Sequence, residues 1–371
     1  MDRIVRGNRL LGIIVCTVQQ YPPIPEKSYY ELLTLIGKNM GIEIVVFSPK
    51  SINWAVRRVQ GFVYDPVLKR WRMKTTTLPN VIYDRCFYMS TNHYQSYQPY
   101  VQKLRRDPHI KLLGVPLKGK WQLAELVAQS PLSRYLPHTV RYTTQKDALT
   151  FLQKNKAIVA KPIGGSHGRG IVAIFRSKQN NPYYVIGRTK ENRALSLTFE
   201  NIRHTLNWLD RFIGNTRYIL QPYLHLRTPG NVPFDIRVLM QKDERQQWQM
   251  TGMAVRTGAP NALTSNLHSG GTAKKIAPFL TQLFYDRQTV QRIEQEIRTL
   301  CQRISLLIEQ KHGRLCELGI DIGIDTQKRV WLLEVNSKPG RQVFRQSGEK
   351  HIYYTALKRP LMYAHSLLQA R

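Results

Sequence analysis

Three oxygen-bearing side chains near the C-terminus have the types and the spacing of a metal site. Asp321 lies in one apolar run, and Glu334 and Asn336 lie two residues apart in a second apolar run. Residues i and i+2 of a β-strand point to the same face, so Glu334 and Asn336 project together. Pairing of the two runs as a hairpin across the D-T-Q-K-R segment would bring Asp321 to that face. Two carboxylates and an amide carbonyl suit a hard cation such as Mg²⁺, with Mn²⁺ as the alternative ion.

The same hairpin has a plainer interpretation, in which its acidic residues only face water. Three apolar residues of the second run, Leu332, Leu333 and Val335, argue against a strand that lies free in solvent. They would pack on one side and leave Glu334 and Asn336 on a face that needs a partner. On this segment the pattern favours the metal interpretation.

Residues 157–175 read as a strand, a glycine-rich loop and a second strand, with Lys161 at the end of the first strand. Glycines let backbone N–H groups approach phosphate oxygens closely, and a lysine adds a point charge. The loop returns into a strand, whereas a dinucleotide-binding fingerprint opens a helix. No G-K-[ST] follows, and a near match at 114–121 has Trp121 in place of the hydroxyl residue of a P-loop. A flexible hairpin turn is the alternative. The loop glycines are Gly164, Gly165, Gly168 and Gly170.

These segments occur in a fixed order with several others. An amphipathic helix follows Lys120, and then come Y-I-L-Q-P-Y-L, F-D-I-R-V-L-M and T-S-N-L-H-S-G-G before the Asp321 hairpin. The series resembles the ATP-grasp superfamily over roughly residues 116–345. The F-D-I-R, S-N-L-H-S-G-G and L-E-V-N-S-K-P-G elements look like the ribosomal-protein glutamate ligase branch. The finer detail resembles the YheC/YheD family of endospore coat-associated ATP-grasp proteins, through G-K-W, K-P-x-x-G-S-x-G-R-G, E-L-G-I-D-I-G-I-D and W-L-L-E-V-N-S-K-P-G.

The resemblance implies ATP-binding roles for the first group of matching residues. Lys161 would contact the ATP phosphates, and residues 164–170 would close over them as a lid. Lys120 would be a second lysine on the phosphate or adenine side. The lid residues are Gly164, Gly165, Ser166 and Gly168, and the residues expected to offer backbone groups to adenine are Gln221, Pro222 and Tyr223.

The resemblance also implies roles for residues of the C-terminal part. Asp235 would bind the nucleotide on the ribose side. Arg237 lies two residues on and on the same strand face, which suits the γ-phosphate and the charge that develops during its transfer. Ser265 and Asn266 would make a further phosphate contact. The ligase branch often has an arginine where Thr264 stands, and Arg256 is a candidate source of that charge. Asp321, Glu334 and Asn336 match the metal ligands of the family.

The resemblance and the element pattern together predict an α/β ATP-grasp fold in three domains. Residues 1–115 would form an N-terminal, Rossmann-like α/β domain, 116–228 a central domain with the lid, and 229–371 a C-terminal domain with the metal site. The basic helical segment after Arg341 would close the last domain. Within the first domain the pattern predicts a strand at 11–18, a helix at 26–39 ended by Gly41, a strand at 42–47, a hairpin at 59–74 and a strand at 81–88.

Tyr83, Asp84 and Arg85 lie near the end of the last of these strands. In this superfamily the preceding domain often lines the acceptor-substrate side, so these residues could face that cleft. The interpretation as ordinary polar residues of a strand edge is favoured over that role.

Composition is compatible with a globular, multidomain protein. The chain has 371 residues, of which 42% are hydrophobic and 10% aromatic. No apolar run reaches the roughly 18 residues that span a bilayer. Residues 10–18 lack a small-residue cleavage site and read as a buried strand rather than a signal segment. Four scattered cysteines without a C-x-x-C pair indicate reduced thiols in a cytosolic compartment, without support for zinc binding.

The formal net charge of +32 exceeds what an ATP site needs. It implies a polyanionic partner, such as an acidic polymer or a spore-coat component. The basic residues are spread over all predicted domains, and no nucleic-acid module is visible, so specific DNA recognition is disfavoured. The alternative is a basic surface adapted to an anionic coat layer.

The function that these features predict is an ATP- and Mg²⁺-dependent ligase that joins a carboxylate to an amine, or to a thiol, through an acylphosphate. Lys161 and Arg237 would be its working groups, together with the metal. His268 is a candidate base, although a structural role in its turn is favoured. A non-catalytic, ATP-binding coat scaffold and a polyanion-binding protein are the alternatives. The expected location is the cytoplasm, with association with the endospore coat, and neither substrate can be named.

Overall fold

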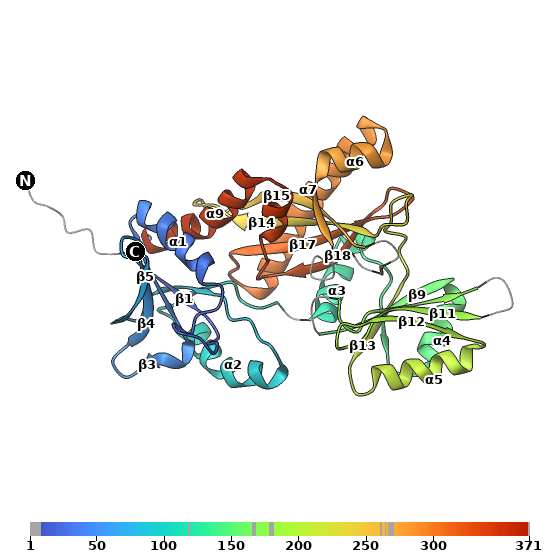
Figure 1. Cartoon of the computed structure of the whole chain (residues 1–371), viewed down its shortest axis with the longest axis horizontal. Coiled ribbons are helices and arrows are strands. Elements are labelled where there is room, and N and C mark those ends of the chain that lie inside the picture. The colour runs from blue at the N-terminus through green and yellow to red at the C-terminus, as the bar shows by residue number, and fades with distance from the viewer. Residues whose placement is uncertain are drawn as a thin grey trace, which may run out of the picture.

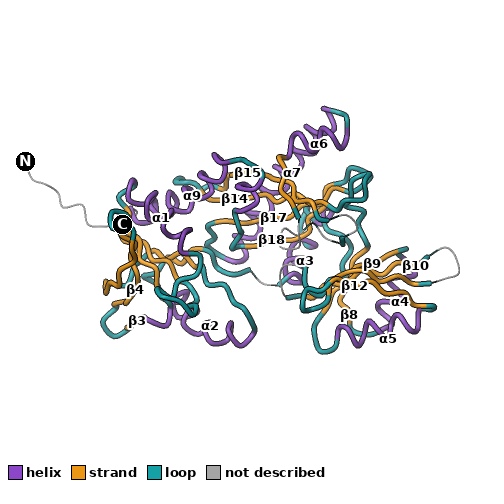
Figure 2. The backbone as a smooth tube through the Cα atoms, viewed as in Figure 1, coloured by secondary structure: helices purple, strands orange, loops and turns teal. Residues whose placement is uncertain are grey.

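The computed structural model describes residues 9–369 except 118, 165–167, 178–181, 260–261, 264 and 266–270. Its described residues contain three β-sheets, each with helices packed on it (Figure 1). The sheets follow one another along the chain as an N-terminal, a central and a C-terminal unit, and Figure 2 shows their strands as separate groups. The α/β class predicted from the sequence is confirmed, since the three sheets occur together with helices along the chain.

The N-terminal sheet has the order β3-β4-β2-β1-β6-β7, with β5 paired to β4. Strands β2, β1, β6 and β7 are mutually parallel. The apolar runs of β1 and β2 are buried on both sides, as expected for parallel strands covered by helices. The bounds are β1 Arg9–Ile14, α1 Lys27–Asn39, β2 Ile42–Phe47, η1 Pro49–Ser51, β3 Ile52–Asn53, β4 Arg58–Asp65, β5 Arg70–Thr77, β6 Val81–Asp84, α2 Thr91–Arg106 and β7 Lys111–Leu113.

The predicted β-α-β beginning and the hairpin are present, with two differences at strand ends. Gly41 follows the end of α1 with a φ of 68°, a left-handed conformation that glycine adopts at little cost. However, β1 ends at Ile14 rather than at residue 18, and β6 ends at Asp84 rather than at residue 88. Both strands stop where their shared parallel ladder stops, since Ile14 is paired with Asp84.

The central sheet has the order β12-β11-β10-β9-β13-β8 and is antiparallel throughout. Helices α4 and α5 cover one face, where they bury Ile158 and Ala160 of β9 and Leu220 of β13. Alternation along a strand therefore places the residues between these on the opposite face. The bounds are β8 Val140–Tyr142, α4 Gln145–Lys154, β9 Ala157–Pro162, β10 Val172–Arg176, β11 Tyr183–Arg188, β12 Ala194–Phe199, α5 Ile202–Ile213 and β13 Tyr218–Pro222.

The C-terminal sheet is antiparallel, with the order β16-β15-β14-β17-β18. One face packs on the long helix α7, whose buried residues recur at helical spacing. The bounds are α3 Lys120–Ala128, η2 Ser133–Tyr135, β14 Phe234–Lys242, β15 Trp248–Thr257, β16 Thr272–Lys275, α6 Ile276–Phe284, α7 Arg287–His312, β17 Glu317–Ile324, β18 Val330–Asn336, α8 Gln342–Gln346 and α9 Lys350–Gln369.

Two helices pack against a different sheet from the one that the predicted domain bounds assign to them. Val127 of α3 and Tyr135 belong to the core of the C-terminal sheet, although they precede the central sheet. Leu357 and Leu361 of α9 join the core of the N-terminal sheet beside α1, and the C-terminus lies at that end of the molecule (Figure 1). The helix also contacts the C-terminal sheet through Ala356. The division at residues 115 and 228 stays a prediction.

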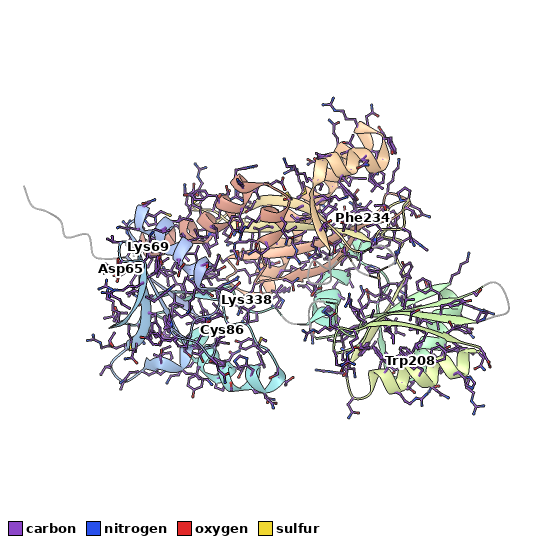
Figure 3. All side chains as sticks on the ribbon, in the orientation of Figure 1. Asp65, Lys69, Cys86, Trp208, Phe234 and Lys338 are labelled. Atoms are coloured by element: carbon purple, nitrogen blue, oxygen red, sulfur yellow. The ribbon has the colours of Figure 1, made fainter. Side chains whose placement is uncertain are left out.

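A buried polar network joins the N-terminal and C-terminal units. Glu317 of β17 is fully buried and accepts hydrogen bonds from Tyr83 and Arg341. Arg85 lies 3.6 Å from the same carboxylate. Lys338 donates to Asp84 at 2.7 Å and to the carbonyl of Cys86 at 2.9 Å. Lys338 and Cys86 are labelled in Figure 3. The favoured interpretation of Tyr83, Asp84 and Arg85 as ordinary strand-edge residues is therefore wrong, because all three are buried.

The other features of the described residues fit a globular protein. Cys16, Cys86, Cys301 and Cys316 are buried and free, as predicted. None of the helices in the described part of the chain combines the length and the apolar character that a membrane crossing requires.

Candidate active site

A row of charged side chains crosses one face of the C-terminal sheet. Arg237 of β14 is paired with Asp321 of β17, and Asp321 is paired with Glu334 of β18. Residues directly opposite in an antiparallel sheet point to the same face, so these three lie side by side. Ile236 and Ile322 point the other way, into the core under α7. The predicted hairpin and its predicted polar face are thus both present.

The centre of this row is a tight ion-pair network. Arg237 donates through Nε and a terminal nitrogen to the two oxygens of Asp321, at 2.5 and 3.1 Å. Arg256 of β15 forks onto Asp235 at 2.6 and 2.7 Å and also lies 2.9 Å from Asp321. Burial would raise the pKa of Asp321, but the two guanidinium groups outweigh it and hold that pKa below its ordinary value. Asp321 is therefore an ionised, buried oxygen donor.

Lys161 faces this sheet from the central unit. On β9 it alternates with Ile158 and Ala160, so it points away from α4 and α5, together with its neighbours Ile219 and Gln221 on β13. These residues line a cleft that is closed on its other side by α3 and β18. The cleft has a volume of about 390 Å³, open solvent included. Its lining residues are Lys120, Leu123, Ala124, Leu136, Lys161, Ile219, Gln221, Leu332, Leu333 and Glu334.

Two lysines and one carboxylate set the charge of the cleft. Burial lowers the pKa of Lys161 to about 8; Glu334 raises that pKa and so opposes part of the effect, whereas Lys120 adds to the lowering. Lys120 Nζ lies 3.5 Å from Glu334 Oε1. Its backbone N–H donates to the carbonyl of Ile163 at 3.2 Å, which ties the start of α3 to the end of β9. The predicted pair of lysines is thus brought together with Glu334.

The part of the glycine-rich loop that leads into β10 has conformations that require glycine. Gly168 and Gly170 have φ values of 74° and 70°. Tyr218 donates its hydroxyl hydrogen to the carbonyl of Gly170 at 2.9 Å, and a Cβ on Gly170 would lie only 2.7 Å from that hydroxyl oxygen. The loop is therefore anchored to β13 at one end. Gly165 and Ser166 lie outside the described residues, so the lid role stays a prediction.

The segment predicted to contact adenine lies at the end of β13. Gln221 is buried, lines the cleft, and donates from its side chain to Thr139 at 2.8 Å. Pro222 ends the strand. Tyr223 donates its backbone N–H to Ala157 at 3.0 Å, so this donor is already used by the sheet. Among the predicted residues of this segment, Gln221 is the one that lines the cleft.

The remaining predicted nucleotide contacts are only partly described. Asp235 lies on the polar face of the C-terminal sheet, where Arg256 holds both of its oxygens. Ser265 is buried, whereas Asn266, Thr264 and His268 lie outside the described residues. Arg256 was the candidate source of the positive charge that the ligase branch has at the position of Thr264. It lies within the ion-pair network around Asp321.

The oxygen donors present fit a hard cation. Asp321 and Glu334 are direct neighbours across β17 and β18, and Asn336 follows two residues along β18. No three histidine, cysteine, aspartate or glutamate side chains gather for a metal anywhere in the described residues, so the amide of Asn336 and substrate phosphates would have to complete the shell. Asp321 would share its oxygens with Arg237 and Arg256.

Sequence reasoning missed the apolar part of the cleft. Leu136 and Ile219 line it, and the alternation of β13 could have identified Ile219. Leu333 is also there, because the register of β17 and β18 shifts between Asp321 and Ile322 and leaves Leu333 as the extra residue of a bulge. The expectation that Leu333 packs in the core with Leu332 and Val335 is therefore wrong.

Comparisons with known proteins agree with this geometry. Residues 109–367 match the family model described as YheC/D like ATP-grasp. The chain belongs to the YheC/D-like ATP-grasp family. The endospore coat-associated protein YheC of Bacillus subtilis (strain 168) is 32% identical over 339 residues, which cover 90% of this chain and 92% of that protein.

Solved structures share the fold at low sequence identity. D-cycloserine synthetase DcsG superposes with a TM-score of 0.55 and 11% identity, covering 97% of this chain and 99% of that one. The ATP-grasp ligase PsnB, in a complex with minimal precursor, Mg and ADP, gives a TM-score of 0.52 and 13% identity, covering 95% and 99%. The ATP-grasp fold predicted from the sequence is therefore confirmed, and membership of the family implies ATP binding.

Proposed function

We propose that this protein is an ATP- and Mg²⁺-dependent ligase that joins a carboxylate to an amine, or to a thiol, and that it acts in association with the endospore coat. The observation that most supports this proposal is that Lys161, Lys120 and Glu334 line one cleft. Glu334 is also the last residue of the Arg237–Asp321–Glu334 row. Cations for phosphates and carboxylates for a metal thus lie in one place. The relation to a coat-associated protein of Bacillus subtilis supports the location.

The reaction would run in two displacements. An oxygen of the substrate carboxylate attacks the γ-phosphorus of ATP, and ADP leaves, which gives an acylphosphate. The amine then attacks the acyl carbon, inorganic phosphate leaves with the electron pair of the broken C–O bond, and the amine loses a proton. Positioning and charge neutralisation supply most of the catalysis in such transfers.

Each charged residue of the cleft has a defined task in this scheme. The ammonium of Lys161 would neutralise phosphate oxygens, and Lys120 would add a second positive charge beside it. Arg237 would stabilise the charge of the transferred group. A bound Mg²⁺ would supply Lewis-acid neutralisation of the phosphates and would be held by Asp321, Glu334 and Asn336.

The test supplies ATP, Mg²⁺ and pools of carboxylates and amines, measures phosphate release, and identifies the new bond by mass spectrometry. The proposal expects amine-dependent phosphate release in the wild type and none in Glu334→Gln, which keeps the size of the side chain but removes a charge. Glu244→Gln is the matched control, since Glu244 is exposed in the turn between β14 and β15. Turnover that survives in Glu334→Gln would contradict the proposal.

A second candidate is an ATP-binding coat scaffold without turnover. Its support is that Asp321 is already engaged by two guanidinium groups, which compete with a metal for its oxygens. Binding of ATP that is unaffected by Mg²⁺, with no phosphate release from any pool, would favour the scaffold over the ligase.

A further inference from the structure

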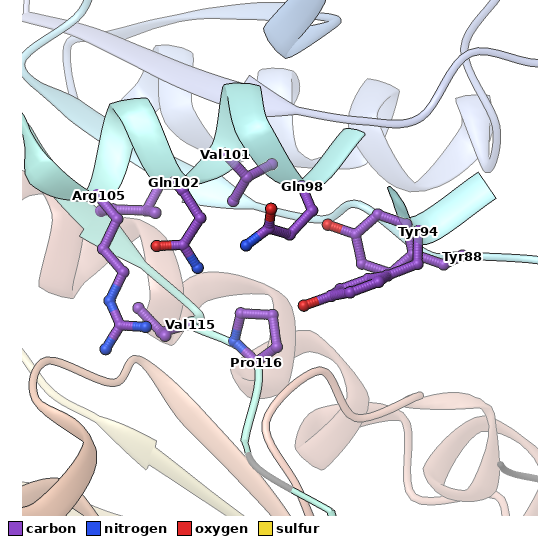
Figure 4. A pocket seen from close by; sticks show the side chains of 9 residues that line it. Tyr88, Tyr94, Gln98, Val101, Gln102, Arg105, Val115 and Pro116 are labelled. Carbon is purple, nitrogen blue, oxygen red and sulfur yellow. The ribbon is translucent and has the colours of Figure 1, made fainter. Parts of the chain in front are cut away.

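A second pocket lies outside the nucleotide cleft, between α2 and the chain that leaves β7 (Figure 4). Its space is about 300 Å³ with open solvent included, but its enclosed part is only about 30 Å³, roughly the volume of one water molecule, so it suits an anchor for part of a larger ligand rather than a whole small molecule. In Figure 4, Gln98 and Gln102 extend from α2 toward Val115 and Pro116. The lining residues are Tyr88, Tyr94, Gln98, Val101, Gln102, Arg105, Leu112, Val115 and Pro116.

The polar lining repeats along one face of α2. Tyr94, Gln98 and Gln102 are spaced four residues apart, and Arg105 follows three residues later. Four residues of an α-helix rise about 6 Å, whereas two residues of an extended chain span roughly 6.6 Å. Successive side chains of this face can therefore meet every second peptide group of an extended polypeptide. A carboxamide both donates and accepts, as a peptide group requires.

These amides are available for a ligand. Among the described residues, the side chains of Gln98 and Gln102 make no hydrogen bond to another protein group, and the phenol oxygens of Tyr88 and Tyr94 make none either. Arg105 makes one long hydrogen bond, of 3.4 Å, to the carbonyl of His312. Its guanidinium can take a carboxylate without leaving an anion of the protein unpaired.

The charge around the pocket selects an acidic ligand. Helix α2 has no aspartate or glutamate, and its last turn carries Lys103, Arg105 and Arg106. Asp107, which follows α2, is paired with Arg57 at 2.7 Å, and Asp84, whose charge acts on the lining residue Tyr88, is paired with Lys338 at 2.7 Å. The basic side chains near the pocket therefore attract an anionic chain, in addition to the attraction by the net charge of +32.

The pocket adjoins the nucleotide cleft on two sides. Lys338, two residues beyond Asn336, lies 5.7 Å above the ring of Tyr88. Pro116, on the opposite wall, is four residues before Lys120, which pairs with Glu334. A chain bound along α2 would therefore pass next to the loop that follows β18.

We propose that this pocket anchors an extended, acidic polypeptide, with a carboxylate on Arg105, peptide groups on Gln98 and Gln102, and a side chain against Tyr88 and Tyr94. Its further role as the acceptor site of the ligase rests on the function proposed above. Binding of the polypeptide is independent of that function.

The test measures fluorescence anisotropy of a labelled glutamate–tyrosine copolymer with the full chain at about 150 mM salt. The double variant Gln98→Leu/Gln102→Leu and the single variant Arg105→Gln should each weaken binding about tenfold. The matched control Arg106→Gln changes the same charge one residue away, outside the lining, and should change affinity less than about twofold. Thermal melting checks that each variant is folded.

Three results would overturn the proposal. The first is that the copolymer does not bind to the wild type. The second is that Arg106→Gln weakens binding as much as Arg105→Gln, which would indicate diffuse charge attraction. The third is that single-stranded DNA binds as tightly as the copolymer and is equally sensitive to the glutamine variants.

Lys161→Met should leave copolymer affinity unchanged. Copolymer binding without ATP turnover would keep this inference and reject the ligase function.

Discussion

ATP affinity should depend on pH because of Lys161, and substitution of Lys161 should remove this pH dependence. Burial lowers the pKa of this lysine to about 8 in the free protein. Its protonated fraction therefore falls from about nine-tenths near pH 7 to about one-tenth near pH 9. If only the ammonium form holds the triphosphate, the apparent affinity falls about tenfold over that range, in proportion to the competent fraction. The sign is fixed, because an anionic ligand raises the pKa of the lysine that binds it.

The assay is calorimetric titration with a non-hydrolysable ATP analogue and Mg²⁺ at both pH values, with the wild type and Lys161→Met. The variant should bind roughly a hundredfold more weakly near pH 7, since a charge-assisted contact is worth about 2–3 kcal/mol. It should also lose most of the pH dependence. Lys146→Met is the control, because Lys146 is exposed on α4 away from the cleft. Equal affinities, or an equal pH dependence, for the wild type and Lys161→Met would refute the assignment of Lys161.

The remaining predictions concern the metal, the domain junction and the basic surface. Glu334→Gln should reduce the Mg²⁺ dependence of ATP binding while it leaves the melting temperature nearly unchanged, because its pair with Lys120 is partly exposed to solvent. Glu317→Gln should lower the free energy of unfolding by about 3–5 kcal/mol in urea titrations, since it leaves buried Arg341 without its anion. Charge reversal at Lys69, Arg70 and Arg72 should weaken polyphosphate binding and spare ATP affinity. That binding should fall steeply between about 50 and 200 mM salt, and a flat response would reject a polyanionic partner.

The site was predictable where strand periodicity fixes it. The i, i+2 spacing of Glu334 and Asn336, and the hairpin to Asp321, follow from local sequence, and the register confirms that Asp321 and Glu334 are neighbours. The same argument applied to β13 would have placed Ile219 in the cleft. The ion-pair network around Asp321 was harder to predict from the sequence, because Asp321 and its partner Arg237 are 84 residues apart in the chain.

The contacts between units could not be read from local patterns. Lys338 and Asp84 are 254 residues apart, and each looks like an ordinary surface residue in its own segment. The apolar face of α9 fits a core equally well whether that core belongs to the C-terminal or the N-terminal sheet, and it contacts both. The pocket along α2 was missed because its glutamines and tyrosines also suit a solvated helix face.

The most direct measurement is a crystal structure of the protein with a non-hydrolysable ATP analogue and Mg²⁺. The predicted result is a triphosphate beside Lys120 and Lys161, with the ion on the oxygens of Asp321, Glu334 and Asn336. A nucleotide bound elsewhere, or an ion held without Glu334, would contradict the account.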